Sequence, residues 1–540
     1  MASIADNLEP ENIIRDIAAC NQQLIAAQQS PAEAIIIENF LKKYPLPIIL
    51  QSIGGDKEGH TNPESNIALV AEFLNRIFFN KCNMTIISPN LAGTMDYLVL
   101  GLTSVYGEIQ TLSLRVLNHI FDLGSKNNEN ITENSYNIDP QFVKCLINLL
   151  ESENIKVGKE VVDVLSKYGM YCSQANRESL LVQMVDHFRA SADEDSIIQV
   201  RISEIIIRIC HLKHRFHQCI ETGALSLVEE LLVNDDVLVQ MNVIEVIKML
   251  AATPHGAKHL LGNNVCDKLF RILGVAFDGN NVDGTTSEEA VEPLLWGGAI
   301  ELLGRICTTS LSEEDAADES VSKDRSKKVA IFIVAAVTIM RNHSSGDSNM
   351  ALIALDAIRL FAKESYDNAW IVYNHHTCID TILTWTGCAS NEFRGLAFHT
   401  LADLFREAKL NADRGKLLYQ RIGASNGSDN TDDMLLEHVV KPLQETKHGI
   451  LDMFAAILET VWGVRVLMSN KRFEDYLLNT KAESGYIDKQ WKFVLLQNLR
   501  NNVDGWNLLR EELKDDLLTI LKNGPFYTLS GGLEVKTEQA

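Results

Sequence analysis

Apolar residues recur along this chain at the spacing of one face of a helix, and the pattern returns about ten times. The clearest copy, residues 196–232, reads SIIQVRISEIIIRIC, HLKHRFHQCI and ETGALSLVEELL. Its first part carries one broad apolar stripe, formed by Ile198, Ile202, Ile205, Ile206 and Ile209. Such a stripe must be buried against a neighbour, so the pattern predicts amphipathic helices that stack on one another.

The central apolar residue of each segment is its anchor. The ten anchors are Leu74, Leu117, Leu165, Ile206, Ile247, Leu303, Ile358, Leu401, Phe454 and Leu496. Successive anchors lie 41 to 56 residues apart, and the short spacings of 41 to 43 define the basic repeat. A second helical segment ends 13 to 15 residues after several anchors, at Ile87, Ile220, Leu261, Tyr373 and Met468. This period is typical of armadillo and HEAT repeats.

The turn from Glu221 to Leu225 resembles that of an armadillo repeat, because its glycine can end a helix in the left-handed conformation. One repeat cannot bury its stripe alone. We therefore predict an all-α armadillo/HEAT-like repeat solenoid over residues 1–540, a right-handed superhelix of about ten repeats with a long concave groove. Full burial is expected for Ile206, Ile247, Leu303 and Leu401.

Four polar segments interrupt the repeats, at residues 124–140, 278–289, 310–328 and 423–433. Their Asn-rich, Gly-rich or charged composition predicts mobile inserts within a single solenoid and no domain boundary. The apolar run from Val329 to Met340 predicts a buried helix, since its 12 residues fall short of the roughly 20 that cross a bilayer.

The chain is expected to end in a capping segment and tail over residues 523–540. The sequence predicts one last helix from Trp506 to Lys522, stopped by Asn523-Gly524-Pro525. Phe526 and Tyr527 are expected to fold back on the last repeat.

Composition and charge narrow the class of protein. The 540 residues include only 31 Gly and 11 Pro, which favours long helices. The formal net charge of −23 repels phosphates and anionic lipid, so we expect neither nucleic acid nor a membrane as a partner. Ten cysteines are scattered without a Cys-x-x-Cys pair, which is typical of reduced cytosolic or nuclear thiols. The acidic amino-terminus lacks the basic and apolar regions of a secretory signal.

Motifs of catalysis are weak. The chain has neither the phosphate-binding loop nor the Gly-x-Gly-x-x-Gly turn that would hold a nucleotide, so we expect no cofactor. The segment Gly423-Ala424-Ser425-Asn426-Gly427 matches a nucleophile elbow, but that elbow needs a strand before it and a helix after it. Because SDNTDD follows, we interpret the segment as a surface loop and expect no catalytic residue.

The segment from Cys210 to Cys219 is the sharper chemical candidate. Cys210, His214 and His217 share one helical face, a spacing that could supply three metal ligands. In repeat register, however, this is the short connecting helix, so we expect no metal there. A metalloenzyme stays the alternative, and elemental analysis would distinguish it.

Four tryptophans lie on or beside repeat helices, and we interpret them as part of the core: Trp296, Trp370, Trp462 and Trp491.

An acidic residue stands two positions before seven of the ten anchors. The seven are Glu72, Asp163, Glu204, Glu245, Glu301, Asp356 and Asp452. This position lies about 200° around the helix from the buried anchor, so the carboxylates are expected to face solvent. On the concave side of an armadillo-type stack they would form a ladder of negative charge that orients a basic patch on a partner. Ordinary solvated charges are the alternative.

The carboxy-terminal part carries an ordered set of motifs. Residues 450–478 read ILDMFAAILETVWGVRVLMSNKRFEDYLL, residues 489–499 read KQWKFVLLQNL, and Asn523-Gly524-Pro525-Phe526-Tyr527 closes the set. Together they resemble the carboxy-terminal region of the 26S proteasome non-ATPase regulatory subunit 5 family, the armadillo/HEAT chaperones of proteasome base assembly. The rest of the chain agrees with that family in repeat type, helicity and acidic charge.

The resemblance implies a non-catalytic chaperone that grips the carboxy-terminal domain of one AAA+ ATPase subunit of the base through its groove. It implies a second ATPase subunit and the large non-ATPase scaffold subunit as further partners, release before the proteasome is complete, and a location in the cytoplasm and also the nucleus. Two other solenoid adaptors, a nuclear transport receptor and an Hsp70 nucleotide exchange factor, would show the same repeats. The co-purified partner would distinguish them.

Overall fold

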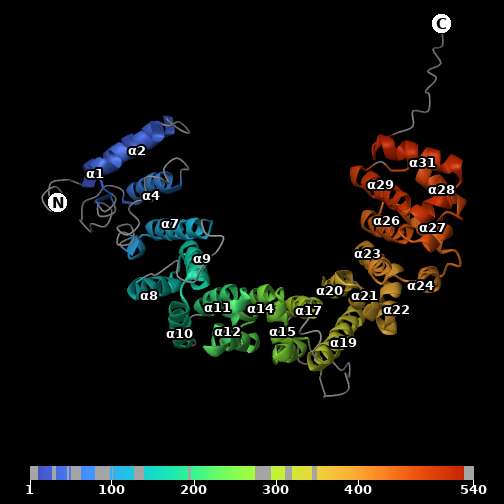
Figure 1. Cartoon of the computed structure of the whole chain (residues 1–540), viewed down its shortest axis with the longest axis horizontal. Helices are drawn as coiled ribbons and strands as arrows, with labels where there is room; N and C mark the ends of the chain where they lie inside the picture. Colours follow the sequence, from blue (N-terminus) through green and yellow to red (C-terminus); the bar gives the residue numbers. More distant parts are fainter. Residues whose placement is uncertain are drawn as a thin grey trace, which may run out of the picture. The chain divides into compact units, whose positions relative to one another are not determined.

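The structure is a computed structural model, and its described residues consist of helices and turns. They are 10–26, 32–45, 48–49, 63–79, 98–99, 101–126, 139–191, 196–273, 293–309, 319–342, 349–483 and 485–527. No strand occurs among them. The chain divides into two compact units, Met1–Asn234 and Asp235–Ala540 (Figure 1).

The first unit contains α1 (Pro10–Ala26), α2 (Ala32–Lys43), α4 (Pro63–Phe79), α7 (Gly107–Lys126), α8 (Pro140–Asn148), η3 (Leu149–Glu151), α9 (Ile155–Tyr171), α10 (Gln174–Ala190), α11 (Ser196–Cys210), α12 (Lys213–Glu221), α13 (Ala224–Glu230) and η4 (Leu231–Val233).

The second unit contains α14 (Val237–Ala251), α15 (Pro254–Gly262), α16 (Val265–Ile272), α17 (Pro293–Thr308), α19 (Glu319–Asn342), α20 (Asn349–Glu364), α21 (Tyr366–Asn374), α22 (His376–Thr386), α23 (Asn391–Glu407), α24 (Ala412–Ser425), α25 (Thr431–Val439), α26 (Gln444–Leu458), α27 (Val461–Leu467), α28 (Lys471–Leu478), α29 (Tyr486–Asn501), α30 (Val503–Asn507) and α31 (Glu511–Asn523).

One helix of each repeat carries the anchor, and we call these the row helices. They are α4, α7, α9 and α11 in the first unit and α14, α17, α20, α23, α26 and α29 in the second. Within each unit, consecutive row helices are in contact. All ten anchors are at most 2% exposed, including Ile206, Ile247, Leu303 and Leu401 as predicted. The core therefore runs along the row helices, and the predicted all-α repeat fold is confirmed.

The copy at residues 196–232 folds as its pattern predicts. It forms α11, α12 and α13, and Gly223 takes the left-handed conformation with φ of 72° before α13. The second helices α12, α15, α21 and α27 end within one residue of the positions expected from the sequence. The remaining expected end, at Ile87, lies outside the described residues.

A capping device recurs at the same register in three repeats of the second unit. Six residues after the anchor, Thr253 and Thr460 accept a hydrogen bond from the backbone N–H of a glycine three residues later. Asn502 caps α30 in the same way. A Cβ atom added to Gly463 would lie 2.1 Å from the carbonyl oxygen of Ile457, so the close helix turn requires glycine. The sequence pattern Thr/Asn-x-x-Gly is the signal of this device.

Two inserts differ from their predicted loops. Residues 319–328, inside the third insert, form the first turns of α19, because Glu, Lys and Arg of ESVSKDRSKK favour a helix and the apolar run that follows continues it. Residues 423–433 are the end of α24, a short turn and the start of α25, which Asn430 caps. Residues 127–138, 278–289 and 310–318 of the other inserts lie outside the described residues.

The apolar run from Val329 to Met340 lies in α19, and most of its large side chains are buried as predicted. Across the ranges that the structure describes, no helix is both long enough and apolar enough to span a bilayer.

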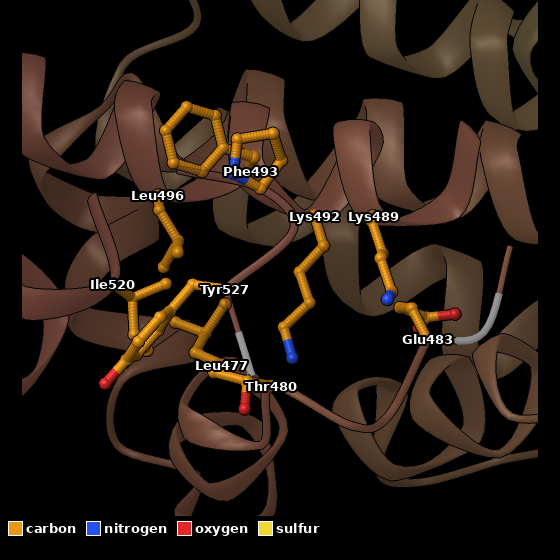
Figure 2. Close-up of a pocket in the computed structure, with 10 residues that line it drawn as sticks. Leu477, Thr480, Glu483, Lys489, Lys492, Phe493, Leu496, Ile520 and Tyr527 are labelled. Atoms are coloured by element: carbon orange, nitrogen blue, oxygen red, sulfur yellow. The ribbon is translucent and has the colours of Figure 1, made fainter. Parts of the chain in front are cut away.

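The end of the chain forms two helices instead of the single predicted helix. The first of them, α30, ends at Asn507, and the extended backbone of Arg510 separates it from α31. Trp506 and Leu509 are both buried around this break. α31 ends at Asn523, as the sequence predicts, and Gly524 follows with φ of 85° and ψ of 178°, a conformation that requires glycine but is not the left-handed helical cap. Beyond it the chain turns back, and Tyr527 lines a pocket together with residues of α28, α29 and α31 (Figure 2).

Candidate partner-binding face

The seven predicted carboxylates lie on seven different row helices, each two residues before its buried anchor. In each unit, we call the surface on which they lie the row face. Their side chains range in exposure from 66% at Glu245 and 54% at Glu72 to 11% at Asp452. The structure therefore aligns them in register along each unit but does not expose them equally.

In the first unit, each ladder carboxylate has a basic partner. Glu72 accepts a hydrogen bond from Arg76 one turn later on the same helix, at 2.8 Å. Arg208 of α11 binds two carboxylates, Glu204 on its own helix at 2.5 Å and Asp163 on the preceding row helix. One guanidinium thus joins two consecutive repeats.

The same arrangement returns in the second unit. Lys248 of α14 donates to Glu245 on its own helix at 2.6 Å and to Glu301 of α17. Arg359 of α20 lies 2.9 Å from Asp356 on its own helix and 3.4 Å from Asp403 of α23. Arg208 and Lys248 each contact two ladder carboxylates, so a net negative charge of about one remains in each of these two groups, whereas Glu72 and Arg76 pair one to one.

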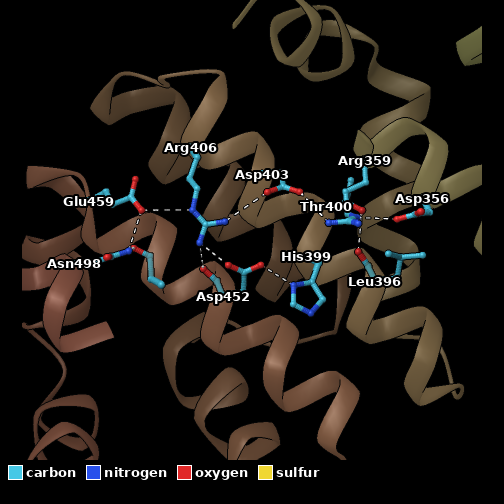
Figure 3. A network of polar contacts seen from close by, with 11 residues as sticks. Asp356, Arg359, Leu396, His399, Thr400, Asp403, Arg406, Asp452, Glu459 and Asn498 are labelled. Atoms are coloured by element: carbon cyan, nitrogen blue, oxygen red, sulfur yellow. Dashed lines mark hydrogen bonds and ion pairs between the residues drawn. The ribbon is translucent and has the colours of Figure 1, made fainter. Parts of the chain in front are cut away.

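The most extensive network joins α23, α26 and α29 (Figure 3). Arg406 of α23 lies 2.5 Å from Asp452, 3.4 Å from Glu459 and 3.5 Å from Asp403. Asp452 also lies 2.6 Å from Nδ1 of His399, the residue that replaces an acid at this repeat position. These contacts fix the side chains between two row helices.

Burial and pairing shift the acidities within this network. Burial opposes ionisation of Asp452, but the hydrogen bonds from His399 and Arg406 outweigh it and lower its pKa. Burial dominates at Asp403 and raises its pKa, although Arg359 and Arg406 oppose that shift. Asp452 is therefore the carboxylate most firmly held in its charged form here.

The expectation that all seven carboxylates face solvent is wrong for Asp452. Its residue is only 8% exposed, because Arg406 and His399 of the preceding row helix cover it. Sequence reasoning also missed the basic partners. A base three or four residues after the acid signals the partner at four positions, Glu72, Glu204, Glu245 and Asp356. The partners of Asp163, Glu301 and Asp452 lie on other row helices and have no such local signal.

The row helices also approach one another closely at two glycines. A Cβ atom added to Gly395 of α23 would lie 2.7 Å from the carbonyl oxygen of Glu445, and one added to Gly449 of α26 would lie 2.4 Å from that of Gly395. The two backbones therefore pack with no side chain between them at this point.

The structure does not bring the Cys210–Cys219 segment together as a metal site. Cys210 and Cys219 are fully buried in the core, whereas His214 and His217 are exposed. Burial raises the pKa of the Cys210 thiol well above its ordinary value. Within the described ranges, no cluster of three or more His, Cys, Asp or Glu side chains could hold a metal ion.

The elbow-like segment Gly423–Gly427 is the end of helix α24 and the turn after it, not a strand-to-helix turn. The tryptophans differ in burial. Trp462 is 7% exposed, as expected for core, whereas Trp370 is half-buried and stacks on Tyr366 and Tyr373 with ring centroids 5.9 and 5.7 Å apart. Trp296 and Trp491 are also half-buried.

The fold and the row face define an all-α protein of armadillo/HEAT-like repeats without a recognisable catalytic constellation among the described residues. The family described as proteasome non-ATPase 26S subunit matches residues 85–278 and 332–539, so the chain belongs to that family. The match reaches far beyond the carboxy-terminal motifs, and the resemblance predicted from the sequence is confirmed.

Curated relatives bear the same kind of name. The chain is 22% identical to the 26S proteasome non-ATPase regulatory subunit 5 of Bos taurus, with 79% of this chain and 80% of the relative covered. It is 20% identical to the protein of that name from Homo sapiens over the same shares. Among solved structures, an engineered protein has a TM-score of 0.41 at 13% identity, covering 84% of this chain and 98% of its own. A designed armadillo repeat protein has a TM-score of 0.33 at 16% identity, covering 51% and 99%.

Proposed function

We propose that the chain is a non-catalytic assembly chaperone of the regulatory particle base of the 26S proteasome. It binds the carboxy-terminal domain of an AAA+ ATPase subunit through the row face, associates with a second ATPase subunit and the large non-ATPase scaffold subunit, and leaves before the proteasome is complete. It acts in the cytoplasm and also in the nucleus. Membership of the proteasome non-ATPase 26S subunit family is the observation that carries this proposal.

The charges of the row face support a grip on a basic surface. Each shared cation, such as Lys248 between Glu245 and Glu301, leaves one carboxylate charge uncompensated. The ion pairs also hold the carboxylates in place, which lowers the entropy lost when a partner orders them. A regularly spaced negative surface speeds and orients the approach of a positive one.

The mechanism is steric. A chaperone bound along the carboxy-terminal domain of one ATPase covers surface that the finished particle needs, so ring and core-particle contacts wait until it leaves. The partner distinguishes this proposal from the other solenoid adaptors: co-purification with proteasome ATPases supports it, whereas a Ran-type GTPase or Hsp70 as the main partner contradicts it.

The row face can be tested with matched variants of the full chain. The first combines Glu245→Gln, Glu301→Gln and Asp356→Asn. The control combines Glu512→Gln, Asp515→Asn and Asp516→Asn on the exposed side of α31, with the same change of net charge. Affinity for the isolated ATPase carboxy-terminal domain is measured by calorimetry at two salt concentrations.

We expect the row-face variant to bind at least about tenfold more weakly at low salt, equivalent to about 1.4 kcal/mol, with a smaller difference at high salt. The control should bind within about twofold of the wild type. Equal loss in both variants would show that only the net charge matters and that recognition lies elsewhere. Absence of wild-type binding to any proteasome ATPase would overturn the proposed function itself.

A further inference from the structure

Lys492 of α29 is a buried lysine whose side chain enters the pocket of Figure 2. The residue is only 7% exposed. Apolar side chains form most of the wall, and they are Leu477, Phe493, Leu496, Ile520, Pro525 and Tyr527. Thr480, Glu483 and Lys489 complete it. An amine in such surroundings lacks the water that normally stabilises an ammonium ion.

Two backbone carbonyls hold the amine at the pocket. Nζ of Lys492 donates to the carbonyl oxygen of Tyr476 at 2.5 Å and to that of Asn479 at 2.6 Å. A neutral amine has two N–H groups and a lone pair, whereas an ammonium has three N–H groups. The two carbonyls can accept both N–H groups of the neutral amine, whose lone pair then needs no hydrogen-bond donor; the Tyr476 ring also lies beside the amine, with its centroid 4.6 Å from Nζ.

The surrounding charges do not compensate for burial. The pKa of Lys492 is lowered to about 8, chiefly by burial; the Glu483 carboxylate opposes this shift, and the Lys447 ammonium adds to it. The Glu483 carboxylate is occupied by Lys447 and by the hydroxyl of Tyr476. At about pH 7.5, an amine with this pKa is neutral about 200-fold more often than an ordinary lysine.

The room beside the amine is small. The pocket offers about 20 Å³, which is enough for about one water-sized molecule. Its wall is mostly apolar, and Lys489 supplies a second amine on the same side. These dimensions and this chemistry select a small, uncharged electrophile over a bulky acyl donor.

We propose that Lys492 is a modification site that forms a carbamate with carbon dioxide. The lone pair of Nζ forms the N–C bond, one C=O electron pair of carbon dioxide moves onto its oxygen, and the nitrogen releases one proton to water. The product is an anionic carbamate that the Lys489 ammonium can neutralise. Loss of carbon dioxide and uptake of a proton reverse the step, so no further reactant is needed.

Carbamate formation changes how the pocket is held together. The carbamate nitrogen retains one N–H group, so it can satisfy only one of the two carbonyls at Tyr476 and Asn479. The link between α29 and the segment after α28 is thereby weakened, and this end of the second unit becomes sensitive to dissolved carbon dioxide. This property is independent of any proteasome partner.

The test uses the full-length wild-type protein equilibrated at about pH 7.5 with carbon-13 bicarbonate, which supplies labelled carbon dioxide. Triethyloxonium traps carbamates as ethyl esters, and mass spectrometry of peptides locates them. We expect at least about tenfold higher occupancy at Lys492 than at Lys42 and Lys471, whose side chains are both 68% exposed. Label at Lys492 equal to or below these two would overturn the proposal.

A second measurement needs no variant of Lys492. Carbon-13 NMR of protein labelled at the lysine Cε atoms reports the titration of each lysine across a pH series without a reagent in the pocket, and the Lys492 midpoint is expected near 8. A Lys489→Arg variant should keep the carbamate at Lys492, since arginine preserves the positive charge. The proposal is contradicted if the trapped label in the wild type lies on Lys489 instead of Lys492, or if the titration midpoint of Lys492 equals that of the exposed lysines.

Discussion

Replacing Arg406 by methionine tests whether the network of Figure 3 stabilises the second unit. Methionine keeps an apolar stem of similar length, so the change removes chiefly the guanidinium. Asp452, whose side chain is 11% exposed, then loses a 2.5 Å partner, and Asp403, at 6%, loses one of its two cations. Removing one member of a buried pair typically costs 3 to 5 kcal/mol. Since Arg406 itself is 24% exposed, we expect a loss of about 3 kcal/mol.

Urea unfolding of wild type, Arg406→Met, Asp452→Asn and the double variant measures this loss and the coupling energy of the pair. The pH dependence of the stability difference provides a second test. In the wild type, the lowered pKa of Asp452 gives stability that is present above the unfolded pKa of about 4 and is lost as the pH falls through the folded value. Without Arg406, burial favours the protonated acid, so the stability gap between variant and wild type should narrow from pH 7 to 5. A loss below about 1 kcal/mol with no coupling would refute the reasoning.

Three further outcomes are expected. Ile206→Ala should lower the free energy of unfolding by about 2 to 5 kcal/mol because it empties a fully buried anchor site, whereas Ile197→Ala, at 58% exposure, should cost less than about 0.5 kcal/mol in the same denaturant assay. Gly463→Ala should lower the melting temperature because its Cβ meets a backbone carbonyl, whereas Gly262→Ala meets nothing within 4 Å and should be tolerated. Between pH 7.5 and 10, the free energy of unfolding of the wild type should rise by about 2 kcal/mol relative to that of Lys492→Met, because in this range the unfolded lysine still binds a proton that the folded one has lost. A difference that does not change with pH would contradict a pKa near 8 for Lys492.

The sequence predicts the core better than the surface. The burial of Ile206 and Leu401 follows from helical periodicity alone, because a stripe of that spacing has only one way to leave water. The left-handed helix end at Gly223 was also predictable, since that conformation favours glycine. The buried face of a helix and the conformation of its end are local properties, because residues within one or two helical turns determine them.

The candidate face was only partly predictable. The position of Asp452 two residues before its anchor follows from periodicity, but its burial depends on Arg406, which lies 46 residues earlier. A cation that joins two repeats is invisible in either repeat alone. The start of α19 inside a charged insert, and the break before α31, likewise depend on competition between helix propensity and packing elsewhere.

The cations that bind carboxylates of two row helices constrain how those helices pack, but they do not constrain the length of the loop between them. Arg208 and Asp163 are 45 residues apart in the chain, whereas Lys248 and Glu301 are 53 apart, yet each pair joins a base just after one anchor to the carboxylate two residues before the anchor of an adjacent row helix. A loop between repeats can therefore grow or shrink without disturbing these pairs. Removal of one whole repeat would instead leave a carboxylate of one neighbouring repeat and a base of the other without their partners. The chain can therefore change in length between its repeats but cannot lose a repeat without breaking these ion pairs.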